Sequence, residues 1–237
     1  MFQVPCASPL RLPLSRVFAP PLRVLSGKGV PRIIEKYVYT HTFFRAFNVM
    51  PRQTDSREQM IKAGRRLYSV RGYVGTAFSD VLAESGAPRG SVYFHFPGGK
   101  DEFAGEVVAA HNRSAQARLA RLAVTCPTPQ DLLVAYLKGA RDYTVATDYR
   151  EGCPIGAVIL ESAQASPELL ASAGQAMASS IALLAGLLVE RGASEADAHR
   201  WATAAITAYE GALIVSRALH DPAPFDSLID SLRHAAG

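Results

Sequence analysis

The chain has few cysteines and no long apolar run, and each shortage argues against a class of protein. Its three cysteines, Cys6, Cys126 and Cys153, are too few and too irregularly spaced to indicate a disulfide framework or a zinc site. We therefore expect reduced thiols in a cytoplasmic protein, and no metal or other cofactor. The longest apolar stretch, residues 181–189, is shorter than a membrane-spanning helix requires. We interpret it as part of a buried helix and expect no membrane partner.

Strand-like alternation of apolar and polar residues is also missing, which argues against a β-sheet. Helical spacing recurs instead, and the apolar residues between 60 and 68 fall at the i, i+3/i+4 and i+7 positions of one helical face. Prolines and glycines separate the later apolar stretches. We predict an all-α protein with a first helix from Asp55 or Ser56 and further helices over residues 79–85, 88–96, 100–122, 129–147, 152–163, 167–191, 195–220 and 225–234.

The overall charge is a poor guide to nucleic-acid binding in this chain. The formal charge is +4, but residues 1–49 carry +6, residues 50–113 carry +2 and residues 114–237 carry −4. The basic excess therefore comes from the N-terminal segment. Any attraction for DNA must be local to one face of the folded protein.

Residues 1–49 are rich in proline and arginine and show no sustained helical period. We predict that they are a disordered leader or a mis-assigned start, with translation beginning at Met50. A targeting peptide is the alternative, because the segment is basic and poor in acids.

Two short helices joined by a tight turn are predicted between residues 79 and 96. The first presents Val81 and Leu82 on its apolar side. Gly86 can take the positive φ that ends this helix, and proline at position 88 is tolerated in the first turn of the next. Such a pair suits DNA, because its second helix can enter the major groove.

Residues 57–106 resemble the DNA-binding domain of the TetR family of bacterial one-component repressors. The resemblance rests on an ordered set of motifs, from an aromatic residue and a glycine near the end of the first helix to a G-x-x-Y-x-H-F recognition helix and a lysine that opens the next helix. In this chain these are Tyr68, Gly72, Thr76, residues 90–96 and Lys100. Two further motifs, Pro97-Gly98-Gly99 and Gly152-Cys153-Pro154-Ile155, resemble the LmrA/YxaF-like branch of the family.

The resemblance implies two all-α domains. Residues 50–100 would form a three-helix helix-turn-helix DNA-binding domain, and residues 101–237 a helical domain for effector binding and dimerisation. The implied function is that of a repressor: a homodimer binds a pseudo-palindromic operator in double-stranded DNA and is released by a small molecule. The C-terminal half shows no carboxylate pair, metal cluster or group of basic residues, which favours a neutral, lipophilic or aromatic effector.

The family pattern also places a set of side chains at the DNA surface. Arg89 can bond the O6 and N7 atoms of guanine. Tyr93 and His95 can donate hydrogen bonds to phosphate oxygens, and Lys100 with the N-terminus of its helix can form a phosphate site. The full predicted set is Ser79, Arg89, Gly90, Ser91, Tyr93, Phe94, His95 and Lys100.

Several of these residues have a second interpretation. Ser79 can cap the helix that begins beside it, Tyr93 can be half-buried with only its hydroxyl in water, and His95 can be an ordinary surface histidine. Val92 and Phe96 are expected to pack in the core beneath the recognition helix.

In the C-terminal half, the predicted effector-binding residues are Tyr136, Tyr143, Trp201 and Tyr209. Two helices carry stripes of small residues through which two chains can pack closely, and an intramolecular core is the alternative. The stripes are Ala171, Gly174, Ala178, Ile181, Ala182, Ala185 and Val189 in one helix, and Ala204, Ala205, Ala208, Ala212 and Val215 in the other.

Two other functions are weighed against repression. Cys153 can act as a thiol redox sensor, and a helix-turn-helix can serve as a protein-interaction module. Salt-dependent binding to duplex DNA separates a repressor from such a module. Catalysis by Cys153 with His199 or His220 requires a proximity that nothing in the sequence indicates, so we predict no catalytic residues.

Overall fold

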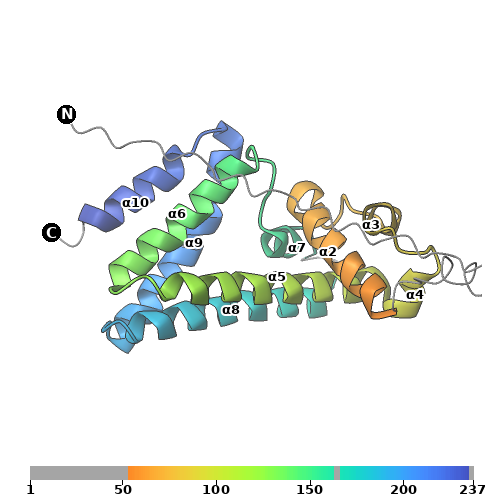
Figure 1. Cartoon of the computed structure of the whole chain (residues 1–237), viewed down its shortest axis with the longest axis horizontal. Helices are drawn as coiled ribbons and strands as arrows, with labels where there is room; N and C mark the ends of the chain where they lie inside the picture. The colour runs from red at the N-terminus through yellow and green to blue at the C-terminus, as the bar shows by residue number, and fades with distance from the viewer. Residues whose placement is uncertain (1–52, 163–165, 235–237) are drawn as a thin grey trace, which may run out of the picture. The chain divides into compact units, whose positions relative to one another are not determined.

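The computed structural model describes residues 53–162 and 166–234, and every structural statement below concerns these ranges. Their regular structure is helical throughout, which confirms the predicted all-α class (Figure 1). The helices are α2 (Gln53–Arg71), α3 (Phe78–Ser85), α4 (Ser91–His95), α5 (Gly99–Ala123), α6 (Pro129–Ala146), α7 (Pro154–Ser162), α8 (Pro167–Val189), α9 (Glu195–Leu219) and α10 (Ala223–His234). The predicted leader, residues 1–49, lies outside the described residues, as do Cys6 and Met50.

Local side-chain chemistry explains where three of the long helices begin. Thr128, Ser166 and Ser194 each stand immediately before a helix and accept a hydrogen bond from the backbone N–H three residues later, at 3.1, 3.3 and 3.1 Å. Such N-caps satisfy donors that the first helical turn leaves free. Pro129 and Pro167 follow two of the caps, where the fixed φ of proline suits a first turn. The predicted ranges of these helices agree with the observed ones to within a few residues.

The helices α2, α3 and α4, which we call the head, pack around Phe103 near the start of α5. Phe103 is 1% exposed, and the ring centroids of Phe96, Phe78 and Tyr68 lie 4.9, 5.4 and 6.1 Å from its own. A Cβ at Gly64 of α2 would stand 2.5 Å from the Phe103 ring. The glycine therefore allows α2 to approach α5 closely, and the aromatic cluster fixes the head on α5.

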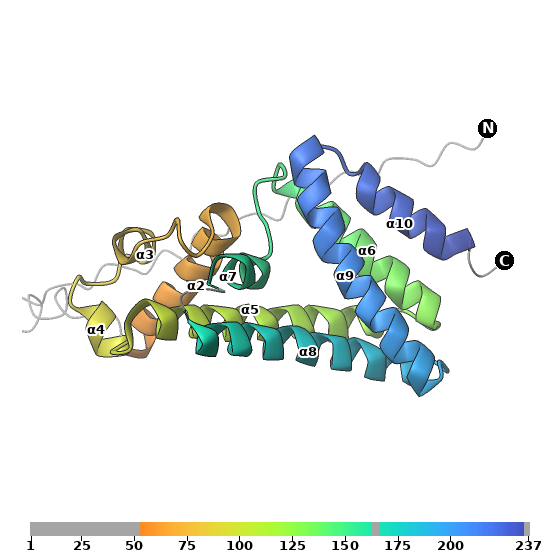
Figure 2. The ribbon, with the colours of Figure 1, turned by 180° about the vertical axis from the view of Figure 1, so that it is seen from behind.

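We call the helices α6 to α10 the body. Helices α6, α8 and α9 form a second core with the far end of α5, whereas Ile155 and Val158 of α7 are buried in the core of the head. Helix α8 runs beside α5 and packs against α9, which crosses it at an angle, and α10 packs against α6 and α9 (Figures 1 and 2). Leu132, Leu184 and Leu188 are fully buried in this core. Because α5 contributes to both cores, the predicted boundary between residues 100 and 101 falls at the start of a helix that continues from the head into the body.

Helix α8 is less buried than its sequence indicates. Leu184 and Leu188 are buried, but Ala182 and Val189 are exposed. The interpretation of residues 181–189 as part of a buried helix is therefore wrong for one face. Among the described helices, α8 is long and apolar enough to span a membrane, although here it packs against α5, α7 and α9.

Candidate nucleic-acid interface and cleft

The predicted recognition helix is shorter in the structure than in the prediction. Its helical part, α4, has five residues instead of the predicted range 88–96. The N–H of Ser91 donates to the carbonyl of Pro88 at 2.9 Å, so the residues before α4 form a turn. The last helical residue is His95. Phe96 follows as the C-cap: its N–H donates to the carbonyl of Val92 at 2.7 Å, and its φ of −137° lies outside the helical region.

Helix α4 has one anchored face and one free face. Val92 and Phe96 are 3% and 0% exposed, which confirms them as core residues. Tyr93 and Phe94 are 77% and 65% exposed, so the interpretation of Tyr93 as half-buried is wrong. His95 is half-buried, with its ring 5.1 Å from that of Phe94 and 6.3 Å from that of Phe96. Two adjacent exposed aromatic side chains on a rigidly held helix are typical of a contact surface.

The side chains that lead into α4 are also at the surface. Arg89 and Gly90 are exposed, and Ser91 is half-buried. A Cβ at Gly90 would meet nothing within 4 Å, so no neighbour in the described part of the chain requires a glycine there. Within the same part of the chain Arg89 makes no ion pair, in contrast to other arginines near α2 and α3. Those arginines form the pairs Arg57–Glu106, Arg66–Glu84 and Arg71–Asp80, at N–O distances of 2.8, 2.5 and 3.3 Å.

Ser79 and Lys100, the two remaining residues predicted to contact DNA, lie in different surroundings. Helix α3 begins at Phe78, and Asp80 accepts the N–H of the preceding Ala77 at 2.9 Å, so capping by Ser79 is wrong. Ser79 is exposed on α3. Lys100 is half-buried, with its Nζ atom 3.4 Å from the carbonyl oxygen of Val74 and 4.5 Å from the centroid of the Tyr73 ring. These contacts within the head therefore partly satisfy the positive charge of Lys100.

The four aromatic residues predicted to bind an effector do not form one cluster. Tyr136 and Tyr209 lie together in the body with ring centroids 5.8 Å apart, and burial raises the pKa of both hydroxyls. Tyr143 is 57% exposed and donates to the Glu151 carboxylate. Trp201 is 37% exposed, and among the described residues neither it nor Tyr143 makes a ring contact with the other two.

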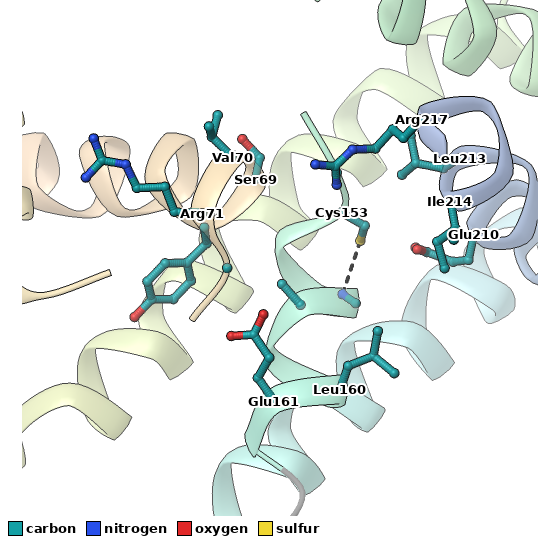
Figure 3. A pocket seen from close by; sticks show the side chains of 15 residues that line it. Ser69, Val70, Arg71, Cys153, Leu160, Glu161, Glu210, Leu213, Ile214 and Arg217 are labelled. Atoms are coloured by element: carbon teal, nitrogen blue, oxygen red, sulfur yellow. Dashed lines mark hydrogen bonds between the residues drawn. The ribbon is translucent and has the colours of Figure 1, made fainter. Parts of the chain in front are cut away.

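A cleft that the sequence does not reveal lies where the head meets the body. It has a volume of about 330 Å³ and is lined by the C-terminal end of α2, by α7 with the residues before it, and by α9 (Figure 3). Residues that line it include Arg71, Cys153, Leu160, Glu161, Glu210 and Arg217. They come from three segments far apart in the chain, so no local motif could have indicated them.

Two hydrogen bonds across this junction tie the head to the body. The N–H of Gly152 donates to the carbonyl of Ser69 at 2.7 Å, and the N–H of Val74 donates to Glu161 Oε2 at 2.6 Å. Gly72 lies between them with a φ of +78°, and a Cβ there would overlap Glu161 Oε1. The end of α2 is therefore in direct contact with α7.

Cys153 lines the cleft, and its side chain contacts Glu210 and not a histidine. Its thiol donates to the Glu210 carboxylate, and its Sγ atom accepts the Gly156 N–H at 3.4 Å. Burial, with a contribution from Glu210, raises the pKa of the thiol well above its usual value. Because the thiolate is the reactive form, this environment opposes oxidation or nucleophilic attack. His220 instead contacts Tyr149, with ring centroids 4.4 Å apart and the ring planes tilted by 46°.

Neither cysteine in the described residues is in a disulfide, and no group of three or more metal-ligating side chains occurs within those residues. The residues predicted to contact DNA between Arg89 and His95 lie on one contiguous segment, in which Arg89, Gly90, Tyr93 and Phe94 are exposed and the other two are half-buried. The head thus presents exposed side chains on and beside α4, and the cleft lies where the head meets the body.

Comparison with known proteins bears on both regions. Residues 60–107 match the model of bacterial regulatory proteins of the tetR family, and residues 129–231 match that of the C-terminal domain of LmrA/YxaF-like transcriptional regulators. The HTH-type transcriptional regulator LmrA of Bacillus subtilis is 31% identical over 72% of this chain and 90% of its own length. YxaF of the same organism, an HTH-type transcriptional regulator, is 29% identical over 74% of this chain and 92% of its own length.

Solved structures show the same fold. A TetR transcriptional regulator from Legionella pneumophila superimposes with a TM-score of 0.67 at 17% identity, covering 75% of this chain and 95% of that protein.

Proposed function

Because the chain belongs to the LmrA/YxaF-like branch of the TetR family of transcriptional regulators, we propose that it is a repressor that binds a double-stranded DNA operator as a homodimer. Like its relatives, it is a regulator of transcription and not an enzyme. We place its action in the cytoplasm, with residues 50–100 binding DNA and residues 101–237 binding an effector and a second chain.

The observation that carries the proposal is the two-sided character of α4. Its inner side chains, Val92 and Phe96, are buried, so the helix is held in one position before any DNA arrives. Its outer side chains, Tyr93 and Phe94, are exposed, and Arg89 stands beside them without an ion pair among the described residues. This is the arrangement that reading a major groove requires, because a displaced side chain cannot bond base edges.

Dimerisation is supported by the exposed face of α8. Ala171, Gly174, Ala178 and Ala182 are exposed in the single chain, so an intramolecular core does not account for them. The stripe on α9 is divided, because Ala205 and Ala212 are buried within the chain whereas Ala204 and Val215 are exposed. A face of small residues on one helix allows a second chain to pack closely, and two-fold symmetry matches a pseudo-palindromic operator.

An effector is proposed because the body is much larger than DNA binding needs and holds the half-buried pair of Tyr136 and Tyr209. A flat, largely apolar aromatic molecule suits this pair, with Tyr143 and Trp201 as further predicted contacts. Such a ligand releases DNA only if it binds the free and the DNA-bound conformations unequally. Calorimetry against an aromatic library, with and without operator duplex, tests this point, and equal affinities in both cases would show that the ligand is not an inducer.

The DNA-binding role is tested with Arg89→Ala and a matched control, Arg113→Ala, at an exposed position on α5. Operator duplexes are first selected from a random pool with the native protein. We expect Arg89→Ala to weaken specific binding by about 1–3 kcal/mol, which is roughly 5- to 150-fold, while the control binds normally. Equal loss on selected and scrambled duplexes would mean that Arg89 contacts phosphate only. No salt-dependent binding of the native protein to any duplex would favour a protein-interaction module.

A further inference from the structure

The cleft between head and body contains a half-buried carboxyl group, that of Glu210, which makes no ion pair among the described residues. Glu210 lines the cleft from α9, and among the described residues no lysine, arginine or histidine lies within ion-pair distance of it. Its neighbours are the Cys153 thiol and the backbone of Gly156, where a Cβ would stand 3.2 Å from Glu210 Oε2. Burial raises the pKa of the Glu210 carboxyl. A buried carboxylate is costly unless a positive group pairs with it.

The two arginines of the cleft already have partners. Arg71 pairs with Asp80 at 3.3 Å. Arg217 donates from Nε to the carbonyl of Tyr149 at 3.2 Å and from Nη2 to that of Arg150 at 3.3 Å. The carbonyl partners of Arg217 are neutral, so its guanidinium keeps a positive charge at the edge of the cleft, but no ion pair joins either arginine to Glu210.

The surroundings of Glu210 also favour a cation. The C-terminal end of α2, a helix of 19 residues, lines the opposite wall, and the C-terminal end of a helix carries partial negative charge. Leu160, Leu213 and Ile214 provide an apolar side to the cleft (Figure 3). The volume of about 330 Å³ lies in the range of small-molecule sites.

We propose that this cleft is a binding site for a small organic cation, an amine or amidine with an apolar portion. The positive group pairs with Glu210 and faces the end of α2, and the apolar portion packs against Leu213 and Ile214. Neither Tyr136 nor Tyr209 lines this cleft, although Glu210 lies close enough to help raise the pKa of both hydroxyls. Because its walls belong to both head and body, an occupant contacts the segment that joins them.

The test compares cations with neutral molecules of the same shape, so that charge is the only variable. The probes are benzamidinium with benzamide, and phenethylammonium with 2-phenylethanol, each titrated into the full chain by calorimetry at pH 7. We expect at least one cation to bind ten or more times more tightly than its neutral partner. DNA is absent, so the result does not depend on operator binding. Equal affinity within both probe pairs would overturn the proposal.

Two variants then locate the site. Glu210→Gln removes the charge and keeps the shape, and it should abolish the preference for the cation, whereas Glu190→Gln, at an exposed carboxylate outside the cleft, should keep it. Should Glu210→Gln fail to fold, Ile214→Lys serves instead, because position 214 is 59% exposed and one turn from Glu210. The introduced ammonium group occupies the place of the ligand and should block the cation. A preference that survives in the folded variant would show that the cation binds elsewhere.

Discussion

Gly72 is the position where one added methyl group should have the largest effect on the junction between head and body. Its φ of +78° lies in the left-handed region, and a Cβ would stand 2.9 Å from Glu161 Cδ and overlap Oε1. Adopting this backbone costs a non-glycine residue about 1–2 kcal/mol. The overlap can be relieved if Glu161 rotates away, but then the hydrogen bond from the Val74 N–H, 2.6 Å long, is lost.

The backbone cost at Gly72 and the loss of the Val74–Glu161 hydrogen bond add up in the single variant, and a second variant separates them. The lost hydrogen bond is exposed, so we assign it about 1 kcal/mol. Gly72→Ala should therefore lower the free energy of unfolding by about 2–3 kcal/mol in total. With Glu161→Ala already present, the overlap and the hydrogen bond no longer exist. Gly72→Ala should then cost only the backbone part, about 1–2 kcal/mol.

Urea denaturation of the native protein, both single variants and the double variant completes the cycle. A coupling of about 1 kcal/mol between positions 72 and 161 is the expected outcome. If Gly72→Ala costs the same in both backgrounds, Glu161 does not constrain the glycine. A cost below about 0.5 kcal/mol in both would refute the need for a left-handed residue as well.

Three further predictions concern Gly64 in the head, His111 on α5 and Phe94 on the free face of α4. Gly64→Ala should lower the melting temperature through an overlap with Phe103 that costs about 1–3 kcal/mol, whereas Gly105→Ala, which meets nothing within 4 Å, should raise it. Burial, assisted by nearby arginines, lowers the pKa of His111 to about 4. Below pH 6.5 the histidine is therefore protonated in the unfolded chain but stays neutral in the folded one. Urea denaturation should show the free energy of unfolding falling by about 3 kcal/mol as the pH is lowered to 4. The variant His111→Gln should not show this decline. Phe94→Ala should change stability by less than about 0.5 kcal/mol yet weaken operator binding in gel-shift titrations.

The helices that the sequence predicts well are those with local start signals. Thr128 and Ser194 accept backbone hydrogen bonds from within their own first turns, so their effect does not depend on distant residues. The range 88–96 predicted for the recognition helix is too long, because Arg89 and Gly90 suit both a helix and a turn. The bond from Ser91 N–H to the carbonyl of Pro88 selects the turn.

The exposed face of α4 could be predicted, because the motif that carries it is contiguous. The cleft could not, since Ser69, Gly152 and Glu210 meet only after α2, α7 and α9 have packed. The exposure of α8 escaped prediction for a different reason. An apolar helix has the same composition whether its own chain or a second chain covers it, so Ala178 and Ala182 alone cannot distinguish the two.

Helix α5 has a mechanical consequence for the control of α4. It begins just after Phe96 and ends at Ala123, and at 1.5 Å per residue its 25 residues measure about 37 Å. A rod of that length converts a tilt of about 5° at one end into a movement of roughly 3 Å at the other. Hydrogen bonds to base edges do not survive displacements of about 1 Å. A rotation small enough to leave both cores packed would therefore take Arg89 and Tyr93 out of register with the bases, and no helix would have to unfold.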